Sequence, residues 1–239
     1  MDLLVTSEWL ADELGSDDLV VLDATVYLTL GPDGYESESG TANFEHAHIP
    51  GARFADLTGA LCDLDSPDRF ALPAPADLAT AFERLGVSDR SRVVVYDDNG
   101  SMWAARVWFM LRWLGFDTAA ILDGGMRVWR DEGRPTEAGS ARGPAAPAGS
   151  LTVSTRPRLV ADKHEVMAAV AAGSTCLIDA LPRSVFSGDV APYGRPGHIP
   201  GASNVPATAM IDRDTGRFLP LDAVQHHFPE RPEARVVAY

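Results

Sequence analysis

The feature that most constrains this sequence is that the first half is repeated in the second half. Four motifs recur in the same order: LVVLDA (19–24) as TCLIDA (175–180), AHIPGARF (47–54) as GHIPGASN (197–204), DLDSPDRFALP (63–73) as DRDTGRFLP (212–220), and RVVVY (92–96) as RVVAY (235–239). One loose match could arise by convergence. Four matches in register indicate a duplicated domain that has taken small deletions.

A segment of different composition separates the two copies. Residues 134–150, RPTEAGSARGPAAPAGS, are rich in Pro, Gly, Ala and Ser and have no periodic apolar face. This composition predicts an extended, exposed linker. We therefore expect a first domain at residues 1–133, a linker at 134–150 and a second domain at 151–239.

Local patterns predict that strands and helices alternate. The runs LVVLDA, RVVVY and TAAILD (118–123) are short and continuously apolar, as expected for strands covered on both faces. Ser7 is the expected N-cap of a short helix through Leu14. Further helices are expected within ADLATAFERLG (76–86), MWAARVWFMLRWLG (102–115) and GGMRVWRDEG (124–133). The fold class predicted for each domain is α/β, a parallel sheet flanked by helices, with the second domain incomplete.

Composition and charge exclude some classes of binding partner. The 239 residues are 46% hydrophobic and carry a formal charge of −14, which argues against nucleic acid or an anionic membrane as the main partner. Small anionic substrates stay open because they need only a local group of arginines. The first residues lack the pattern of a signal peptide, and no apolar run reaches the ~18 residues of a membrane span. The count of two cysteines, Cys62 and Cys176, argues against a disulfide framework and favours a reducing compartment, the cytoplasm.

The motifs in combination resemble the rhodanese family. The resemblance is carried by an Asp that ends the first strand, HIPGA, VVVY running into a loop, and LDGGMRVW (122–129). Two such domains in one chain resemble the tandem thiosulfate or 3-mercaptopyruvate sulfurtransferases. The resemblance implies a cysteine directly after the VVxY strand of the second domain. Its thiolate takes sulfane sulfur from a small anionic donor and passes it, as a persulfide, to a thiol or cyanide; neither a metal nor an organic cofactor is implied.

Here the position of that cysteine would follow Tyr239, the last residue given. We therefore expect a C-terminal truncation before the active-site loop and no catalytic residue in the chain, which would be inactive alone. In the first copy, Asp97 stands at the matching position. The resemblance implies a non-catalytic copy whose loop comprises Asp97, Asp98, Asn99, Gly100 and Ser101, with the Asp97 carboxylate in a ring of backbone amides. Ordinary turn and cap roles for Asp97 and Asn99 are the alternative.

Other polar residues are assigned by comparing the two copies. Arg183 and Arg195 flank the segment in which the family binds the acidic end of its donor, although the usual position of one arginine is Val185. They are candidate donor-binding residues, with surface arginines as the alternative. Asp179 and His198 have counterparts in the first copy, which favours supporting roles, a strand-end acceptor and an imidazole bonded to backbone.

Neither cysteine is a good candidate nucleophile. Acidic neighbours of Cys62 would raise the pKa of its thiol, and Cys176 opens a buried strand. The residue spacings do not predict a metal site. Two other functions remain open: a non-catalytic binding or regulatory module that uses the loop near residues 97–102, and a cysteine-dependent phosphatase, for which a longer loop would be expected.

Overall fold

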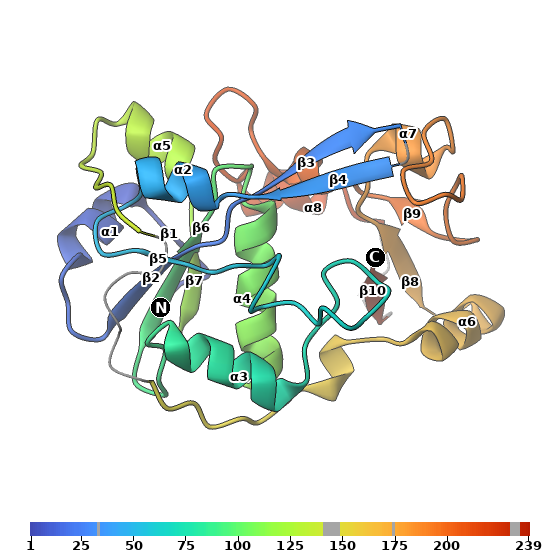
Figure 1. Ribbon diagram of the computed structural model, residues 1–239. Coiled ribbons are helices and arrows are strands. Elements are labelled where there is room, and N and C mark those ends of the chain that lie inside the picture. The colour runs from blue at the N-terminus through green and yellow to red at the C-terminus, as the bar shows by residue number, and fades with distance from the viewer. Residues whose placement is uncertain (33, 141–148, 174, 230–234) are drawn as a thin grey trace. The chain divides into compact units, whose positions relative to one another are not determined.

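The structure is a computed structural model that describes all residues except 33, 141–148, 174 and 230–234 (Figure 1). It divides into two compact units. The first comprises Met1–Tyr27, Ser37–Pro157 and Thr215–Arg217. The second comprises Leu28–Glu36, Arg158–Asp214 and Phe218–Tyr239. The predicted domain limits at residues 133 and 150 stay a prediction.

The first unit is built on a parallel sheet with the strand order β1-β7-β6-β2-β5. The strands are β1 (Leu4–Val5), β2 (Leu19–Asp23), β5 (Arg53–Phe54), β6 (Arg92–Tyr96) and β7 (Ala119–Leu122). The central strand β6 is fully buried from Val93 to Tyr96. This burial explains its continuous apolar sequence, because helices cover both faces of the sheet.

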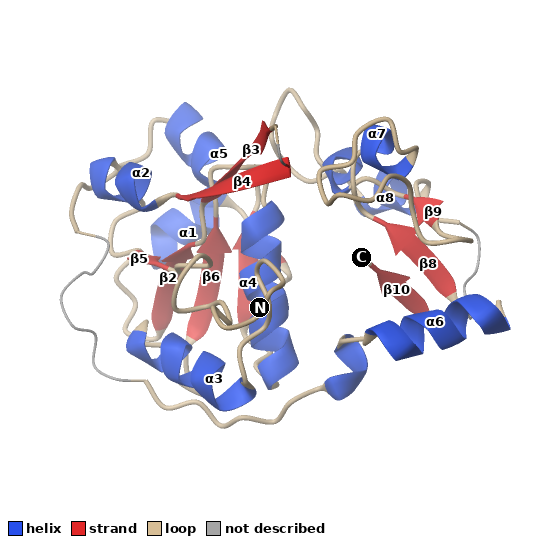
Figure 2. Ribbon diagram, turned by 45° about the vertical axis from the view of Figure 1, so that its right-hand side comes forward, coloured by secondary structure: helices blue, strands red, loops and turns tan. Residues whose placement is uncertain are grey.

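The helices described in this unit are α1 (Ser7–Glu13), α2 (Thr41–His46), α3 (Pro75–Arg84), α4 (Met102–Leu114) and α5 (Gly125–Asp131). Leu10 of α1 and Trp129 of α5 share a core cluster with Val21 and Val94 of the sheet. The long helix α4 packs on β6 and β7 (Figure 2). Thr6, not the expected Ser7, caps α1, because the Thr6 hydroxyl accepts the Trp9 N–H.

Strands β3 (Val26–Gly31) and β4 (Gly34–Ser39) form a separate two-stranded sheet. Neither this hairpin nor α2 was expected from the sequence. Past the predicted linker, residues 151–157 bond along the first unit: Thr152 donates its N–H and its hydroxyl to Asp89, and Arg156 pairs with Asp117.

The second unit has a three-stranded parallel sheet with the order β10-β8-β9. Its strands are β8 (Cys176–Asp179), β9 (Ser203–Asn204) and β10 (Val236–Ala238). Its helices are α6 (Lys163–Ala172), α7 (Arg183–Phe186) and α8 (Leu221–Gln225), with the short 3₁₀ turn η2 (Ala207–Met210). A second 3₁₀ turn, η1 (Pro157–Leu159), begins at the last residue of the first unit. Among the described residues β10 is an edge strand, and Val236 is 55% exposed.

The sequence repeat is visible in the pairing of the strands. The order β6-β2-β5 in the first unit recurs as β10-β8-β9 in the second. The register is also the same: Leu22 lies opposite Val95, and their counterparts Ile178 and Ala238 lie opposite each other. The predicted α/β class, with parallel sheets flanked by helices, is confirmed. In the described part of the chain, no helix has the length and apolar character needed to cross a membrane.

Candidate functional site

The loop that follows β6 surrounds one buried carboxylate with backbone amides. Asp97 is 1% exposed. Its Oδ1 accepts the N–H groups of Asn99 and Ser101 at 2.8 and 2.9 Å. Its Oδ2 accepts those of Trp103 and Ala104, each at 2.8 Å. We call these four donors the amide ring.

Backbone conformation explains the ring. Gly100 and Ser101 have φ values of 70° and 63°, so two successive left-handed residues turn the loop inward. The Trp103 and Ala104 donors belong to the first turn of α4, whose N–H groups lack partners within the helix. Asp97 therefore caps α4 from outside it. Ser101, at the N-cap position, makes no side-chain cap, and its buried hydroxyl has no hydrogen-bond partner in the described part of the chain.

The start of α5 fixes the loop from the other side. Met126 donates its N–H to the Asp97 carbonyl oxygen at 3.0 Å. Gly125 has a φ of 56°, and a Cβ atom there would lie 2.3 Å from the same oxygen. The glycine pair of LDGGM thus permits a close backbone approach, a role that the sequence did not reveal. The signal was available, because a Gly-Gly pair at a strand-to-helix turn is typical of such an approach.

Several carboxylates lie near the ring. The Oδ1 atom of Asp23 accepts the N–H and the hydroxyl of Thr25 at 2.9 and 2.5 Å. Burial raises the pKa of Asp23 to about 6, and the charge of Asp97 contributes to the shift. Burial also raises the pKa of Asp97, while the four amide bonds oppose this effect. Asp98 donates its N–H to Thr25 and pairs through its carboxylate with Arg130.

The amide ring can stabilise one compact anion at the helix terminus, either a carboxylate or a thiolate. In the first unit this anion is the Asp97 carboxylate. A carboxylate cannot form the S–S bond through which a cysteine carries sulfane sulfur. The ring is also filled by the chain itself. It therefore does not offer its donors to an external anion.

The second unit repeats the scaffold below this loop. The Tyr96 hydroxyl accepts the Ile49 N–H at 3.2 Å and bonds to the Asp23 carboxylate. The Tyr239 hydroxyl accepts the Ile199 N–H at 2.8 Å and bonds to its own strand-end partner, the Asp179 carboxylate. Tyr239 thus has hydrogen-bond partners equivalent to those of Tyr96, and a residue that follows Tyr239 would correspond to Asp97.

Asp179 and His198 lie in this scaffold. Asp179 is 1% exposed, and its carboxylate accepts the Leu181 N–H at 2.8 Å. The His198 ring stacks on Phe186 at 3.6 Å, and its Nδ1 lies 2.8 Å from the Phe186 carbonyl. A carbonyl only accepts, so Nδ1 carries the proton. His48 in the first unit makes the same two contacts with Phe44, which supports a structural role for both histidines.

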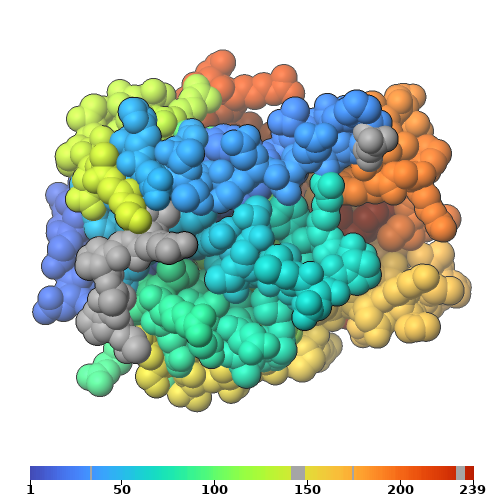
Figure 3. All heavy atoms as spheres, in the orientation of Figure 1, coloured from blue at the N-terminus to red at the C-terminus, as the bar shows by residue number. Residues whose placement is uncertain are grey.

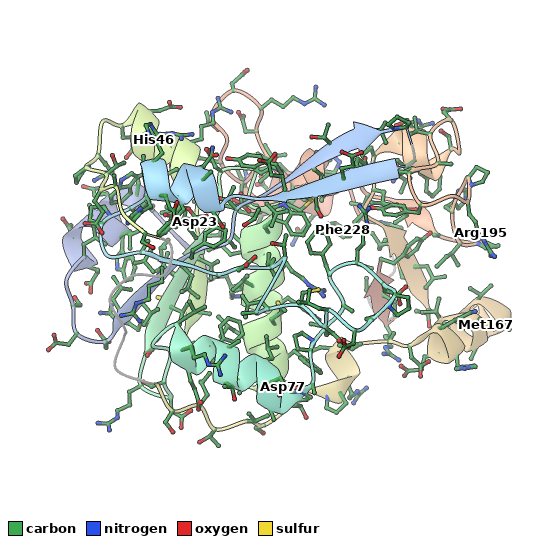
Figure 4. The ribbon with its side chains drawn as sticks, viewed as in Figure 1. Asp23, His46, Asp77, Met167, Arg195 and Phe228 are labelled. Atoms are coloured by element: carbon green, nitrogen blue, oxygen red, sulfur yellow. The ribbon has the colours of Figure 1, made fainter. Side chains whose placement is uncertain are left out.

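The two candidate arginines are exposed. Arg183 is the first residue of α7, and Arg195 projects from the loop that precedes His198 (Figure 4). Within the described residues neither side chain forms an ion pair. Their assignment to a donor site stays a prediction.

Neither cysteine lies in an amide ring. Cys176 is buried on β8 opposite Val236. The Sγ atom of Cys62 lies 3.8 Å from the Asp63 carbonyl oxygen, which is not part of a ring of backbone N–H groups. The residues that the structure describes contain no group of three or more His, Cys, Asp or Glu side chains placed to hold a metal.

The fold and the loop define a class: an α/β protein that holds an anion at a helix start after a buried parallel strand. Comparison with known proteins agrees. The family described as rhodanese-like domain matches residues 6–132. The 3-mercaptopyruvate sulfurtransferase of Escherichia coli (strain K12) is 33% identical over 210 residues, which are 87% of this chain and 72% of that protein. A probable 3-mercaptopyruvate sulfurtransferase of Pseudomonas aeruginosa is 35% identical, with 99% of this chain and 83% of that protein covered.

Among solved structures, SseA from Escherichia coli, a 3-mercaptopyruvate sulfotransferase with the rhodanese fold, superposes with a TM-score of 0.86. The identity is 29%, and the match covers 100% of this chain and 88% of that one. This chain belongs to the rhodanese family, and the relatives named above are sulfurtransferases.

Proposed function

We propose that this protein is a sulfurtransferase that moves sulfane sulfur from 3-mercaptopyruvate or thiosulfate to a thiol or cyanide acceptor. The names of the relatives in Escherichia coli and Pseudomonas aeruginosa favour 3-mercaptopyruvate. The observation that carries the proposal is the repeated scaffold. Tyr239 and Asp179 have the hydrogen bonds that Tyr96 and Asp23 have below the amide ring.

The proposed reaction requires a cysteine thiolate at the position after Tyr239, which corresponds to that of Asp97 in the first unit. The thiolate attacks the outer sulfur of thiosulfate or the thiol sulfur of 3-mercaptopyruvate, and a new S–S bond forms. The bond between that sulfur and the rest of the donor breaks, and its electron pair leaves with sulfite or, from 3-mercaptopyruvate, with the pyruvate enolate. The acceptor then attacks the outer sulfur and restores the thiolate. Arg183 and Arg195 are proposed to bind the acidic group of the donor, and a reducing compartment such as the cytoplasm suits the free thiols.

For residues 1–239 alone we propose that neither donor is turned over, because Cys62 and Cys176 both lie outside an amide ring. The assay is thiocyanate formation from cyanide with either donor. Turnover that is lost in Cys62→Ser or Cys176→Ser would contradict this proposal. In a polypeptide with a cysteine directly after Tyr239, turnover is expected with at least one donor and is lost when that cysteine is replaced by serine.

The non-catalytic binding module is the weaker alternative. Its expected binding element was the ring near residues 97–102, and the Asp97 carboxylate already takes the four amide donors there. Thiosulfate or sulfate binding to the unaltered first unit, mapped by NMR to Asn99 and Ala104, would favour the module.

A further inference from the structure

A small cavity lies beside the amide ring in the first unit. Its volume is about 190 Å³, which corresponds to about six water molecules at ~30 Å³ each. Its lining comes from the ends of β2 and β6 and from helices α2 and α5. The carboxyl ends of parallel strands are where open α/β sheets bind ligands. In the space-filling view the surfaces of α2, in blue, and α5, in yellow-green, meet on this side of the unit (Figure 3).

One part of the lining is acidic. Asp23 and Asp98 both contribute to it. Asp98 is 18% exposed at its side chain and accepts only from the Nη2 atom of Arg130 within the described residues, at 2.6 and 2.8 Å. A carboxylate has about four acceptor sites. Capacity therefore remains for an ammonium group.

The lining also contains hydrogen-bond donors, and the guanidinium of Arg130 lies directly beside Asp98. Arg130 uses one of its three guanidinium nitrogens on Asp98, and in the described part of the chain its Nε and Nη1 have no hydrogen bond. His46 and Asn43 of α2 lie on the same cavity. Figure 4 labels His46 and Asp23, which lie in the same part of the first unit. A planar guanidinium with free N–H groups suits a carboxylate ligand.

The remaining lining is apolar and buried. Phe44 is 1% exposed and Met126 is 2% exposed. These side chains provide a surface for a small aliphatic group but no further polar partner. The cavity therefore combines carboxylate acceptors, a guanidinium donor beside them and an apolar wall.

We propose that this cavity binds a small zwitterion of the α-amino acid class, with its ammonium at Asp98 and Asp23 and its carboxylate at Arg130. The two carboxylates outnumber the single guanidinium, so a simple anion is repelled at the acidic end. A simple cation leaves the free donors of Arg130 unused. The inference does not depend on sulfur transfer, because every residue involved belongs to the first unit.

The test uses residues 1–239 and three probes of similar size: L-alanine, propionate, which lacks the ammonium, and ethylamine, which lacks the carboxylate. Binding is followed by shifts of the backbone amide signals of Thr25 and Asp98. L-alanine is expected to saturate these shifts, and each monofunctional probe to bind about tenfold more weakly or worse, as for loss of a charge-assisted hydrogen bond. Propionate or ethylamine binding as tightly as L-alanine would overturn the proposal, as would no shift with L-alanine.

Variants locate the site. Arg130→Gln and Asp98→Asn are each expected to weaken L-alanine binding about tenfold or more. Arg127→Gln, on the same helix but outside the cavity lining, is the matched control and is expected to keep wild-type affinity. Melting curves identify a variant that is not folded. Unchanged binding in a folded Arg130→Gln protein places the ligand elsewhere and rejects this cavity. Sulfur transfer is measured separately, so failure of either proposal is recognised independently.

Discussion

The carboxylate of Asp97 accepts the backbone N–H of Ala104, seven residues further along the chain, at 2.8 Å. This bond joins the end of a buried strand to the first turn of α4 and closes the amide ring. Asp97→Ala removes the acceptor for four N–H groups. Because most of them are buried, we expect a loss of about 2–4 kcal/mol in the free energy of unfolding, measured by urea denaturation. Asp131→Ala, an exposed carboxylate on α5, is the control, and an equal loss in both variants would contradict the role of the ring.

Gly125 allows α5 to approach the ring. Gly125→Ala places a Cβ atom 2.3 Å from the Asp97 carbonyl oxygen, whereas a Cβ at Gly133 meets nothing within 4 Å. Both glycines have a positive φ, so both variants are strained, but only one clashes. We expect Gly125→Ala to lower the melting temperature clearly more than Gly133→Ala, with an additional cost of about 1–3 kcal/mol. Equal effects would show that the close approach is not a constraint.

The two tyrosines that end the repeated strands are a matched pair. Tyr96→Phe leaves the Ile49 N–H without its buried acceptor and removes a partner of Asp23. We expect a loss of about 1–3 kcal/mol. Tyr239→Phe makes the same change where Tyr239 is 37% exposed, and water can replace the lost partner. The loss of stability in Tyr239→Phe is therefore expected to be smaller than in Tyr96→Phe, and chemical denaturation of both variants measures the two losses. A larger loss in Tyr239→Phe would contradict this account of the two tyrosines.

Asp23 gives the first unit a defined pH dependence. Its folded pKa of about 6 lies above the ordinary 3.8, so between these values the folded state binds more protons than the unfolded state. Stability from this group is therefore present below pH 4 and is lost as the pH rises through 6, about 3 kcal/mol in total. Asp23→Asn removes this slope. We expect the unfolding free energy of the wild type, minus that of Asp23→Asn, to fall from pH 4 to pH 7. A difference that does not change with pH would refute the raised pKa.

Much of the fold was predictable because the same strand motifs occur in both halves of the sequence. The runs at 19–24, 92–96, 175–180 and 235–239 are short, largely apolar and bounded by polar turns. In the structure the run at 19–24 pairs in parallel with that at 92–96, and the run at 175–180 pairs in parallel with that at 235–239. A helix was also expected within residues 102–115, and α4 spans Met102–Leu114. Gly115 ends it in a left-handed conformation, which is a common way for a glycine to terminate a helix.

Other parts were not predictable from periodicity. The hairpin of β3 and β4 has no continuous apolar run, since its arms are partly exposed, and only GPDG at 31–34 signals a turn. The position of Asp97 in the family pattern suggested an amide ring, but not that Gly125 and Met126 close it from α5. That contact joins segments far apart in the sequence. The middle of the predicted linker, 141–148, lies outside the described residues.

The most direct test of the central claim is to place a thiol in the amide ring. Asp97→Cys is made together with Cys62→Ser and Cys176→Ala, and the rate of alkylation is measured against pH, with the protein lacking only Cys62 and Cys176 as the blank. Because four backbone N–H groups and the start of α4 favour an anion, the thiol at position 97 is expected to have a pKa well below the ordinary value of about 8.5. A pKa at or above that value, in a folded protein, would contradict a ring built to hold a thiolate.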